Sequence, residues 1–277
     1  MEENDELETD ENKNKDEKIK KIFKKTLLIV VPILVFMLVS FIILKYIGNY
    51  GIVVREYAIY NDKLPTSFDG IKIVQFSDLH YNDDSSISKV EKIVEMINKT
   101  NPDIVIFTGD LIDRDYLIDN ESLEQLQNRL NSINAKLGKY AIKGEEDDIY
   151  FKQVFDNSNF KILENELEKV YLGNSYISIL NVDDSYLKSD IDGLNENDFL
   201  IALLHMPDLS DRVINDFTPE LIFSGHSHNG QIRLPLIGPL IKKDGAKKYP
   251  NSHYTINNTE LYVSGGLGNS KYDFRLF

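Results

Sequence analysis

The sequence predicts a layered α/β or α+β sandwich preceded by one membrane-spanning helix. Residues 26–44 contain no charged side chain, which favours a transmembrane helix. From about residue 52, short apolar runs alternate with segments of helical periodicity, the pattern expected of strands covered by helices. We therefore expect a charged cytoplasmic tail (1–25), a transmembrane signal anchor (26–45) and a folded domain (46–277).

The uncharged stretch at residues 26–44, TLLIVVPILVFMLVSFIIL, is about as long as a helix that crosses a hydrocarbon layer of roughly 30 Å. A buried helix of a soluble core is the alternative, but such helices normally keep a polar stripe. Residues 13–25 contain seven lysines and two acidic residues, whereas only Lys45 follows the stretch closely. Because lysine-rich flanks stay in the cytoplasm, we expect a single-pass cell-membrane protein whose folded domain is extracytoplasmic.

A cleaved signal peptide is the competing hypothesis for this stretch. The apolar region of a signal peptide is shorter, about 7–15 residues, and it leads into a cleavage site of small residues. No A-x-A pattern follows Leu44, so the uncleaved anchor is favoured.

The overall composition narrows the classes of function. Hydrophobic residues make up 42% of the chain, enough for one core, and there is no cysteine, which excludes disulfide and thiolate chemistry. The formal net charge of -14 argues against nucleic-acid binding, because phosphate backbones need clustered Lys and Arg. Residues 2–17 hold nine acidic side chains, and we expect them to form a solvated, disordered tail.

Seven short apolar runs are predicted to be strands. They are residues 71–76, 103–109, 140–144, 176–182, 199–205, 221–226 and 261–266. Helical periodicity marks two amphipathic faces between them, formed by Val90, Ile93, Val94 and Ile97 and by Leu123, Leu126, Leu130, Ile133 and Leu137. We expect Gly138 to end the second helix as a C-terminal cap.

Polar residues that can bind metals stand where five of these predicted strands end. They are Asp78 and His80, Asp110, the acidic run Glu145, Glu146 and Asp147, His205, and the pair His226 and His228. Ligands of open α/β sheets bind at the ends of strands, where the loops converge on one crevice. The sequence therefore predicts one site built from several strand ends.

Each of these motifs has a simpler explanation when it is taken alone. An Asp before a His is often a helix cap or a surface pair, a Gly-Asp dipeptide is common, and His205 could be a lone core histidine. Two imidazoles two positions apart on a glycine-flanked turn, His226 and His228, are rarer outside metal sites. Together, the carboxylates and imidazoles fit two divalent ions such as Mn, Fe, Zn or Co, about 3.5–4 Å apart. Phosphoester hydrolysis is the reaction that such a pair predicts.

Five ordered motifs resemble the calcineurin-like metallophosphoesterases, within them the membrane-anchored bacterial branch related to UDP-diacylglucosamine pyrophosphatase and phosphodiesterases. The resemblance covers about residues 55–277 and implies a four-layer sandwich of two mixed β-sheets flanked by helices. The motifs are SDLH (77–80), NPDIVIFTGDLID (101–113), LLHMPD (203–208), SGHSHNGQIRLP (224–235) and LYVSGGLGNS (261–270).

The resemblance also implies a role for each candidate ligand. It places Asp110 between the two ions. It assigns Asp78, His80 and His228 to the first metal, and His205 and His226 to the second. The remaining ligand of the second metal belongs to a Gly-Asn-His-Asp/Glu motif, where this chain has Gly144, Glu145, Glu146 and Asp147. Glu145 then replaces an Asn ligand and still offers an oxygen, but its charge weakens the attraction of an anionic phosphate.

Glu146 replaces the family's catalytic His, which contacts the phosphoryl oxygens. An ionised Glu146 would repel the substrate, whereas a protonated one could act as a general acid. Losing such a group typically costs about 10²–10⁴ in rate.

Three functional hypotheses follow from these residues. The first is a dimetal hydrolase of phosphomonoesters, phosphodiesters or pyrophosphates at the outer face of the cell membrane. We expect it to act as a monomer on a phosphorylated small molecule or a lipid-linked substrate. The second is a catalytically impaired module that binds metal or phosphate, since Glu145 and Glu146 replace the family's residues. The third, a metal-free structural domain, leaves the candidate ligands unexplained. For the acidic run GEEDD, residues 144–148, the structural alternative is an acidic surface turn.

Overall fold

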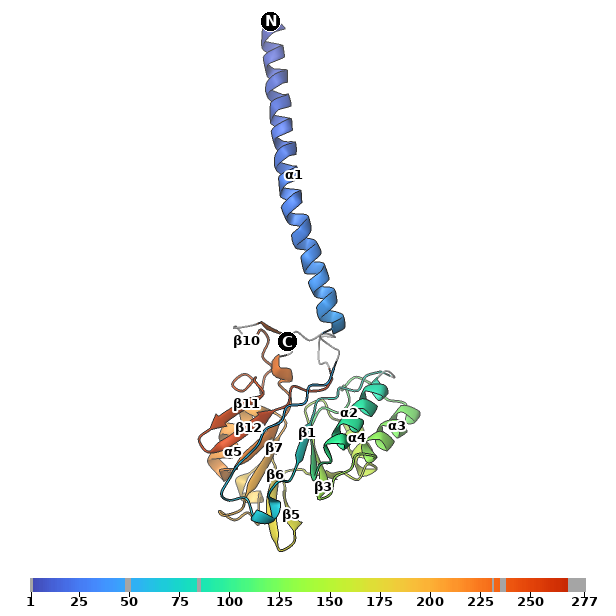
Figure 1. Ribbon diagram of the computed structural model, residues 1–277, viewed down its shortest axis with the longest axis vertical. Helices are drawn as coiled ribbons and strands as arrows, with labels where there is room; N and C mark the ends of the chain where they lie inside the picture. Colours follow the sequence, from blue (N-terminus) through green and yellow to red (C-terminus); the bar gives the residue numbers. More distant parts are fainter. Residues whose placement is uncertain (1, 48–50, 84–85, 231, 235–237, 269–277) are drawn as a thin grey trace. The chain divides into compact units, whose positions relative to one another are not determined.

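The computed structural model describes residues 2–47, 51–83, 86–230, 232–234 and 238–268. The chain divides into two compact units, residues 1–50 and 51–277. The described residues of the first unit form the helix α1 (Glu2–Ile47), which is long enough and apolar enough between Lys18 and Ile42 to cross a membrane (Figure 1). The expectation of a disordered acidic tail is wrong, because α1 begins at Glu2.

The second unit contains a four-stranded sheet in the order β1-β2-β3-β4. Its strands are β1 (Ile73–Phe76), β2 (Ile104–Thr108), β3 (Gly138–Ile142) and β4 (Lys161–Ile162). All the pairs described in this sheet are parallel. The carboxyl ends of neighbouring strands therefore lie at the same edge of the sheet.

A six-stranded mixed sheet has the order β11-β12-β8-β7-β6-β5. Its strands, in chain order, are β5 (Leu167–Leu172), β6 (Ser175–Asn181), β7 (Leu200–Leu204), β8 (Leu221–Ser224), β11 (His253–Ile256) and β12 (Thr259–Val263). The pairs at both edges, β5 with β6 and β11 with β12, are antiparallel, whereas the central pairs are parallel. A separate two-stranded ribbon consists of β9 (Arg233–Leu234) and β10 (Gly238–Pro239).

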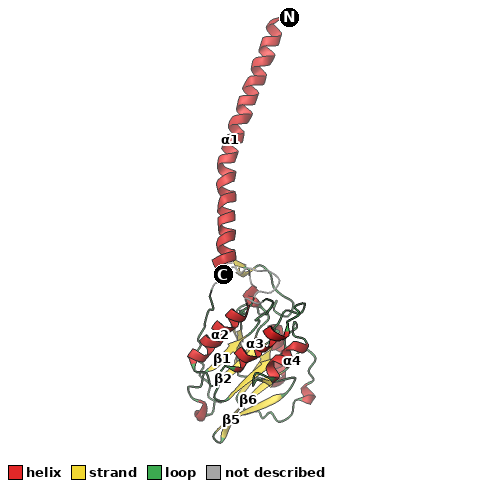
Figure 2. Cartoon of the chain, turned by 90° about the vertical axis from the view of Figure 1, so that its right-hand side faces the viewer, coloured by secondary structure: helices red, strands yellow, loops and turns green. Residues whose placement is uncertain are grey.

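Helices cover the outer faces of the two sheets. The α-helices of the second unit are α2 (Ser86–Thr100), α3 (Asn120–Asn131), α4 (Ile149–Asp156) and α5 (Ser210–Phe217). The 3-10 helices are η1 (Thr66–Phe68), η2 (Lys188–Asp190), η3 (Pro207–Leu209) and η4 (His228–Gly230). Helices α2, α3 and α4 lie beside the first sheet (Figure 2), and α5 packs on the second.

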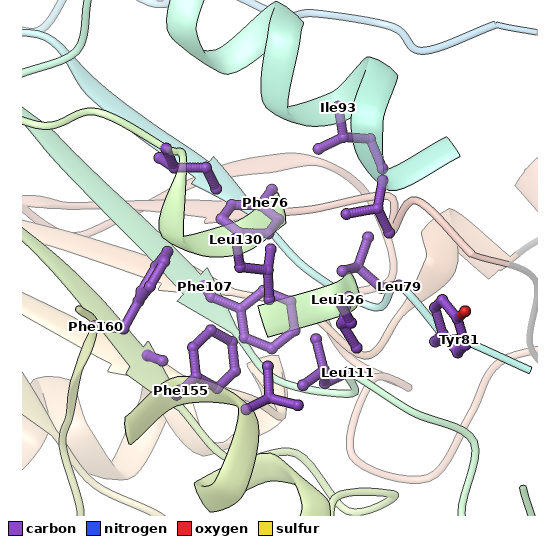
Figure 3. Close-up of a cluster of buried hydrophobic side chains, with 14 of the residues drawn as sticks. Phe76, Leu79, Tyr81, Ile93, Phe107, Leu111, Leu126, Leu130, Phe155 and Phe160 are labelled. Atoms are coloured by element: carbon purple, nitrogen blue, oxygen red, sulfur yellow. The ribbon is translucent and has the colours of Figure 1, made fainter. Parts of the chain in front are cut away.

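Three hydrophobic clusters separate the four layers. Successive residues of a strand point to opposite faces. Val105 and Phe107 of β2 therefore pack under α2, α3 and α4, whereas Ile104 and Ile106 face the second sheet. Figure 3 shows Phe107 in the first of these clusters. Strand β7 divides its residues in the same way between the middle cluster and the cluster under α5. The fold is therefore a layered α/β sandwich of two sheets flanked by helices, as predicted.

Several details differ from the predictions. The smaller sheet is not mixed within its described pairs, since β1 to β4 are all parallel. Helix α3 ends at Asn131 rather than at Gly138, because Ser132 caps it through its backbone N–H and its hydroxyl, and Gly138 begins β3. Ile133 is nevertheless buried, which explains why the apolar periodicity continues beyond the helix. The seven predicted strands correspond to β1, β2, β3, β6, β7, β8 and β12.

Candidate metal centre

The carboxyl ends of strands from both sheets meet at the candidate site. The parallel pairing of β1, β2 and β3 brings Asp78, Asp110 and Glu145 to one edge, and the parallel pairing of β7 and β8 does the same for His205 and His226. Gln75 of β1 joins the two sheets beside this edge. Its side-chain amide donates to the Thr108 hydroxyl at 3.0 Å and to the Ser224 carbonyl at 2.7 Å.

Most candidate ligands have an unusual backbone conformation. Positive φ angles between 45° and 63° occur at Asp78, His80, Asp110, His226 and His228. Non-glycine residues adopt this left-handed region rarely, although Asp and His do so more often than most, and such strain of about 1–3 kcal/mol clusters at functional sites. The left-handed turn directly after each strand brings these side chains together.

The first of two groups of candidate ligands contains Asp78, His80 and His228, all buried. The Nε2 atoms of His80 and His228 are 3.0 Å apart, and Nε2 of His228 is 3.4 Å from Oδ1 of Asp78. In this group, the three ligand atoms lie within 4.8 Å of one another.

The second group contains Asp110, Glu145, His205 and His226. Glu145 contacts both imidazoles, with Oε2 2.5 Å from Nε2 of His205 and Oε1 2.7 Å from Nδ1 of His226. Oδ2 of Asp110 lies 3.3 Å from Nε2 of His205 and 3.6 Å from Nε2 of His80 in the first group. Asp110 therefore stands between the two groups.

The outer ring nitrogens of three histidines contact oxygen atoms, and two of these oxygens can only accept a hydrogen bond. Nδ1 of His205 lies 2.7 Å from the Thr108 carbonyl, and Nε2 of His226 lies 2.6 Å from the Asp244 carbonyl. Nδ1 of His80 lies 2.7 Å from Oδ1 of Asp113. Because a carbonyl needs a donor, the outer nitrogens of His205 and His226 carry hydrogens and their inner nitrogens offer lone pairs when the rings are neutral.

The inner atoms of the second group fit a cation. Within the described part of the chain, the buried atoms Oδ2 of Asp110, Oε2 of Glu145, Nε2 of His205 and Nδ1 of His226 have no hydrogen-bond partner. Buried polar atoms are normally paired, because an unpaired one costs about 1–3 kcal/mol. Four such atoms that face one another are the arrangement expected of a metal-binding site.

Burial and charge act in opposite directions on these side chains. Burial by itself lowers the pKa of His205, but the Asp110 and Glu145 carboxylates outweigh it and raise this pKa well above its ordinary value. Burial also opposes ionisation of Glu145, yet its contacts with His205 and His226 lower the pKa of this carboxyl far below its usual range. Glu145 is therefore an anion, and the second group carries two carboxylates.

Two glycines let the ends of β2 and β3 approach closely. Gly109 has a φ of +94°, and a Cβ there would lie 2.7 Å from the backbone nitrogen of Gly144. A Cβ at Gly144 would collide with the Asp110 carboxylate. Asp147 then fixes this approach, since its carboxylate accepts backbone N–H bonds from Asp110 at 2.9 Å, Leu111 at 2.8 Å and Gly144 at 2.8 Å.

Glu146 lies outside both groups of candidate ligands among the described residues. Its carboxylate is 3.6 Å from Nε of Arg114, and Arg114 also donates to the Glu145 carbonyl. The backbone N–H of Glu146 donates to Oδ1 of Asp110 at 3.0 Å. Glu146 thus adjoins the centre through its backbone, while its side chain pairs with an arginine.

The structure brings together all seven residues that the sequence predicted as metal ligands, and their role as ligands stays a prediction. Sequence reasoning missed Asp113 and the carbonyls of Thr108 and Asp244, which orient these ligands. It named Asp147 as a residue that can bind metals, whereas Asp147 fixes the loop that carries Glu145. Asp113 and Asp147 stand inside recognised motifs, so their position was a usable signal. Backbone carbonyls have no signature in a sequence.

Comparison with known proteins decides the family. The profile of calcineurin-like phosphoesterases matches residues 71–230. A metallophosphoesterase of Bacillus subtilis is 33% identical over 243 residues, which cover 83% of this chain and 84% of that protein. The chain belongs to the calcineurin-like phosphoesterase family. As a metallophosphoesterase, it is a hydrolase of phosphoric ester bonds.

Two further relatives of this metallophosphoesterase have informative names. The UDP-2,3-diacylglucosamine pyrophosphatase of Chlamydia muridarum is 28% identical over 230 residues, covering 62% of this chain and 69% of that protein. A transmembrane protein with a metallophosphoesterase domain from Danio rerio is 26% identical over 261 residues, covering 83% of this chain and 57% of that protein.

Proposed function

We propose that this metallophosphoesterase hydrolyses phosphoester or pyrophosphate bonds with two divalent ions. The observation that carries the proposal is the pair of buried ligand groups joined through Asp110, with unpaired inner atoms in the second group. Asp78, His80 and His228 would hold one ion, Glu145, His205 and His226 would hold the other, and Asp110 would contribute to both sites. Mn, Fe, Zn and Co all suit this mixture of carboxylates and imidazoles.

Bound ions of this kind orient a phosphate, lower the pKa of a water towards neutral and stabilise developing negative charge. The chain's own residues supply the frame for this chemistry. Thr108, Asp113 and Asp244 orient three imidazoles, and Asp147 fixes the loop that carries Glu145. Arg114 adds a positive charge next to Glu145, where it can attract an anionic substrate.

The proposed substrate is a lipid-linked or small phosphorylated molecule at the outer face of the cell membrane. Three features support this proposal: the apolar helix near the N-terminus, the lysines that precede it, and the diacylglucosamine named for the chlamydial relative. We also propose that the chain acts as a monomer, since all seven candidate ligands come from one chain.

A catalytically impaired metal-binding protein is the second candidate function. The observation that favours it is the ion pair between Glu146 and Arg114, since beside the centre these two side chains contact each other. In this case the ions bind as proposed, but phosphoester hydrolysis is slow or lost.

One experiment separates the two candidates. The full chain in detergent micelles is assayed with bis-p-nitrophenyl phosphate in Mn²⁺, beside Asp110→Ala and the double variant Glu145→Asn with Glu146→His. We expect turnover by the native chain that Asp110→Ala abolishes. Hydrolysis by the double variant alone would favour the impaired protein, and hydrolysis by neither, with every metal tried, would contradict the proposed enzyme.

A further inference from the structure

Asp208 ends the LLHMPD motif but belongs to neither group of candidate ligands in the described structure. It lies three residues after His205, within the short helix η3. Its carboxylate accepts three consecutive backbone N–H bonds, with Oδ2 bound to Lys247 at 2.8 Å and Oδ1 to Lys248 at 3.0 Å and Tyr249 at 3.1 Å. A carboxylate that accepts three backbone hydrogen bonds holds the chain segment that donates them.

The segment held in this way, residues 244–249, is fixed at further points. The backbone N–H of Asp208 donates to the Gly245 carbonyl at 2.8 Å. Gly245 has a φ of +85°, and a Cβ there would lie 2.8 Å from the sulfur of Met206, so the segment packs directly against η3. Ala246 is buried. These contacts leave the preceding residue, Asp244, little freedom in where its carbonyl points.

The Asp244 carbonyl is the acceptor for Nε2 of His226 at 2.6 Å. This contact selects the tautomer with hydrogen on Nε2 and turns Nδ1 towards Oε1 of Glu145, 2.7 Å away. The side chain of Asp244 is 89% exposed and pairs with Lys247, so its contribution to the centre comes from the backbone.

We propose that Asp208 is a positioning residue for the second metal ion. It anchors residues 245–249, this anchor fixes the Asp244 carbonyl, and the carbonyl orients His226 towards the second group. The inference rests on the proposed function, because it requires two bound ions. Groups that orient a metal-binding histidine typically change metal affinity about 10–100-fold when they are removed.

Asp211 offers a matched control one helical turn away. Its carboxylate contacts the same segment, but through side chains, the Lys248 ammonium at 2.6 Å and the Tyr249 hydroxyl at 2.8 Å. Asp211→Asn therefore removes a neighbouring negative charge without releasing the backbone of residues 245–249.

The test titrates Mn²⁺ into the metal-free full chain in detergent micelles, by calorimetry and by electron paramagnetic resonance. We expect two ions in the wild type and a spin-coupled Mn pair. Asp208→Ala should lower the affinity for one ion about 10–100-fold, while the affinity for the other ion stays unchanged. At limiting metal, its spectrum should be that of a mononuclear Mn²⁺ site. Asp211→Asn should match the wild type. Asp208→Asn, which keeps the volume and one acceptor oxygen, should lie between them and carries the test where the alanine variant does not fold.

Unchanged affinity for both ions in the Asp208 variants would overturn the inference while leaving the proposed function standing. An equal loss in Asp211→Asn would also overturn it, because loosening of the whole segment would then explain the effect. A wild type that binds fewer than two ions would contradict the proposed function and this inference together. A purely structural role for Asp208 would lower the melting temperature without separating the two affinities.

Discussion

Oε2 of Glu145 lies 2.5 Å from Nε2 of His205, and neither atom has a hydrogen-bond partner outside this pair in the described structure. The acidic run therefore contributes a carboxylate to the second ligand group rather than forming a solvated surface turn. Because Glu145 is anionic and close to the proposed phosphate position, it should hold a cation firmly and weaken the attraction of substrate.

The variant Glu145→Asn tests both effects at once. We expect the second Mn²⁺ to bind more weakly and the KM for an anionic phosphodiester to fall about tenfold, equivalent to roughly 1.4 kcal/mol. Calorimetry measures the first effect and steady-state kinetics at saturating metal the second. Glu145→Ala serves as the control, since it should lose the second ion altogether. A KM that stays constant or rises in Glu145→Asn would contradict the electrostatic argument.

Glu146 gives a second prediction, because its side chain pairs with Arg114 instead of joining the ligand groups. Glu146→His should raise kcat about 10²–10⁴-fold, since an imidazole at this position can contact the phosphoryl group. Glu146→Gln is the matched control and should change kcat less than tenfold. A large loss of kcat in Glu146→Gln would instead show that the Glu146 carboxyl acts as a general acid.

Arg114 can be tested separately through substrate charge. Arg114→Gln should raise the KM for an anionic phosphodiester about tenfold, because it removes a partly exposed positive charge beside the centre. A lower kcat with an unchanged KM would contradict this role. Arg129→Gln, which alters an arginine paired with Glu91 on the surface, is the control and should leave KM unchanged.

The sequence predicted the layers and the ligand set for a common physical reason. Buried strands must be apolar, so a His or Asp directly after such a run is conspicuous, as at His205 and Asp110. The edge strands β5 and β11 were missed because both are partly exposed. The sequence of β5, LEKVYL, mixes charged and apolar residues, and β11, HYTI, is only four residues long. The direction of the Glu146 side chain was not predictable, since a partner 32 residues away determines it.

Gly109 and Gly144 allow a prediction about the approach of β2 to β3. Gly109→Ala should abolish binding of the second ion, because its Cβ would collide with the His205 ring and with Gly144. Gly173→Ala is the control. It has a positive φ of +64° but nothing within 4 Å of a Cβ, so it should cost about 1 kcal/mol of stability and leave metal affinity unchanged. Equal metal affinity in Gly109→Ala and the wild type would contradict the packing argument.

Lys139 carries a prediction about stability, independent of the metal centre. Its buried ammonium donates to the Ser158 carbonyl at 2.8 Å and to the Asn131 carbonyl at 3.2 Å, where α3 ends. Lys139→Met leaves these carbonyls without this donor, so we expect a loss of about 2 kcal/mol. The melting temperature of the full chain in detergent should fall by about 4–8 °C. Lys136→Met, at an exposed ion pair with Asp103, is the control and should shift it far less.

The pH dependence of this stability difference follows from the same burial. Burial lowers the pKa of Lys139 from 10.5 to about 8. Between these two values the unfolded chain binds more protons than the folded chain, so the contribution of Lys139 to the free energy of unfolding rises with pH. The melting-temperature gap between wild type and Lys139→Met should therefore widen from pH 7.5 to pH 9.5, an interval that includes the folded-state pKa of about 8. A gap that stays constant over this interval would contradict the lowered pKa, because Lys139 would then keep its proton in the folded chain as it does in the unfolded chain.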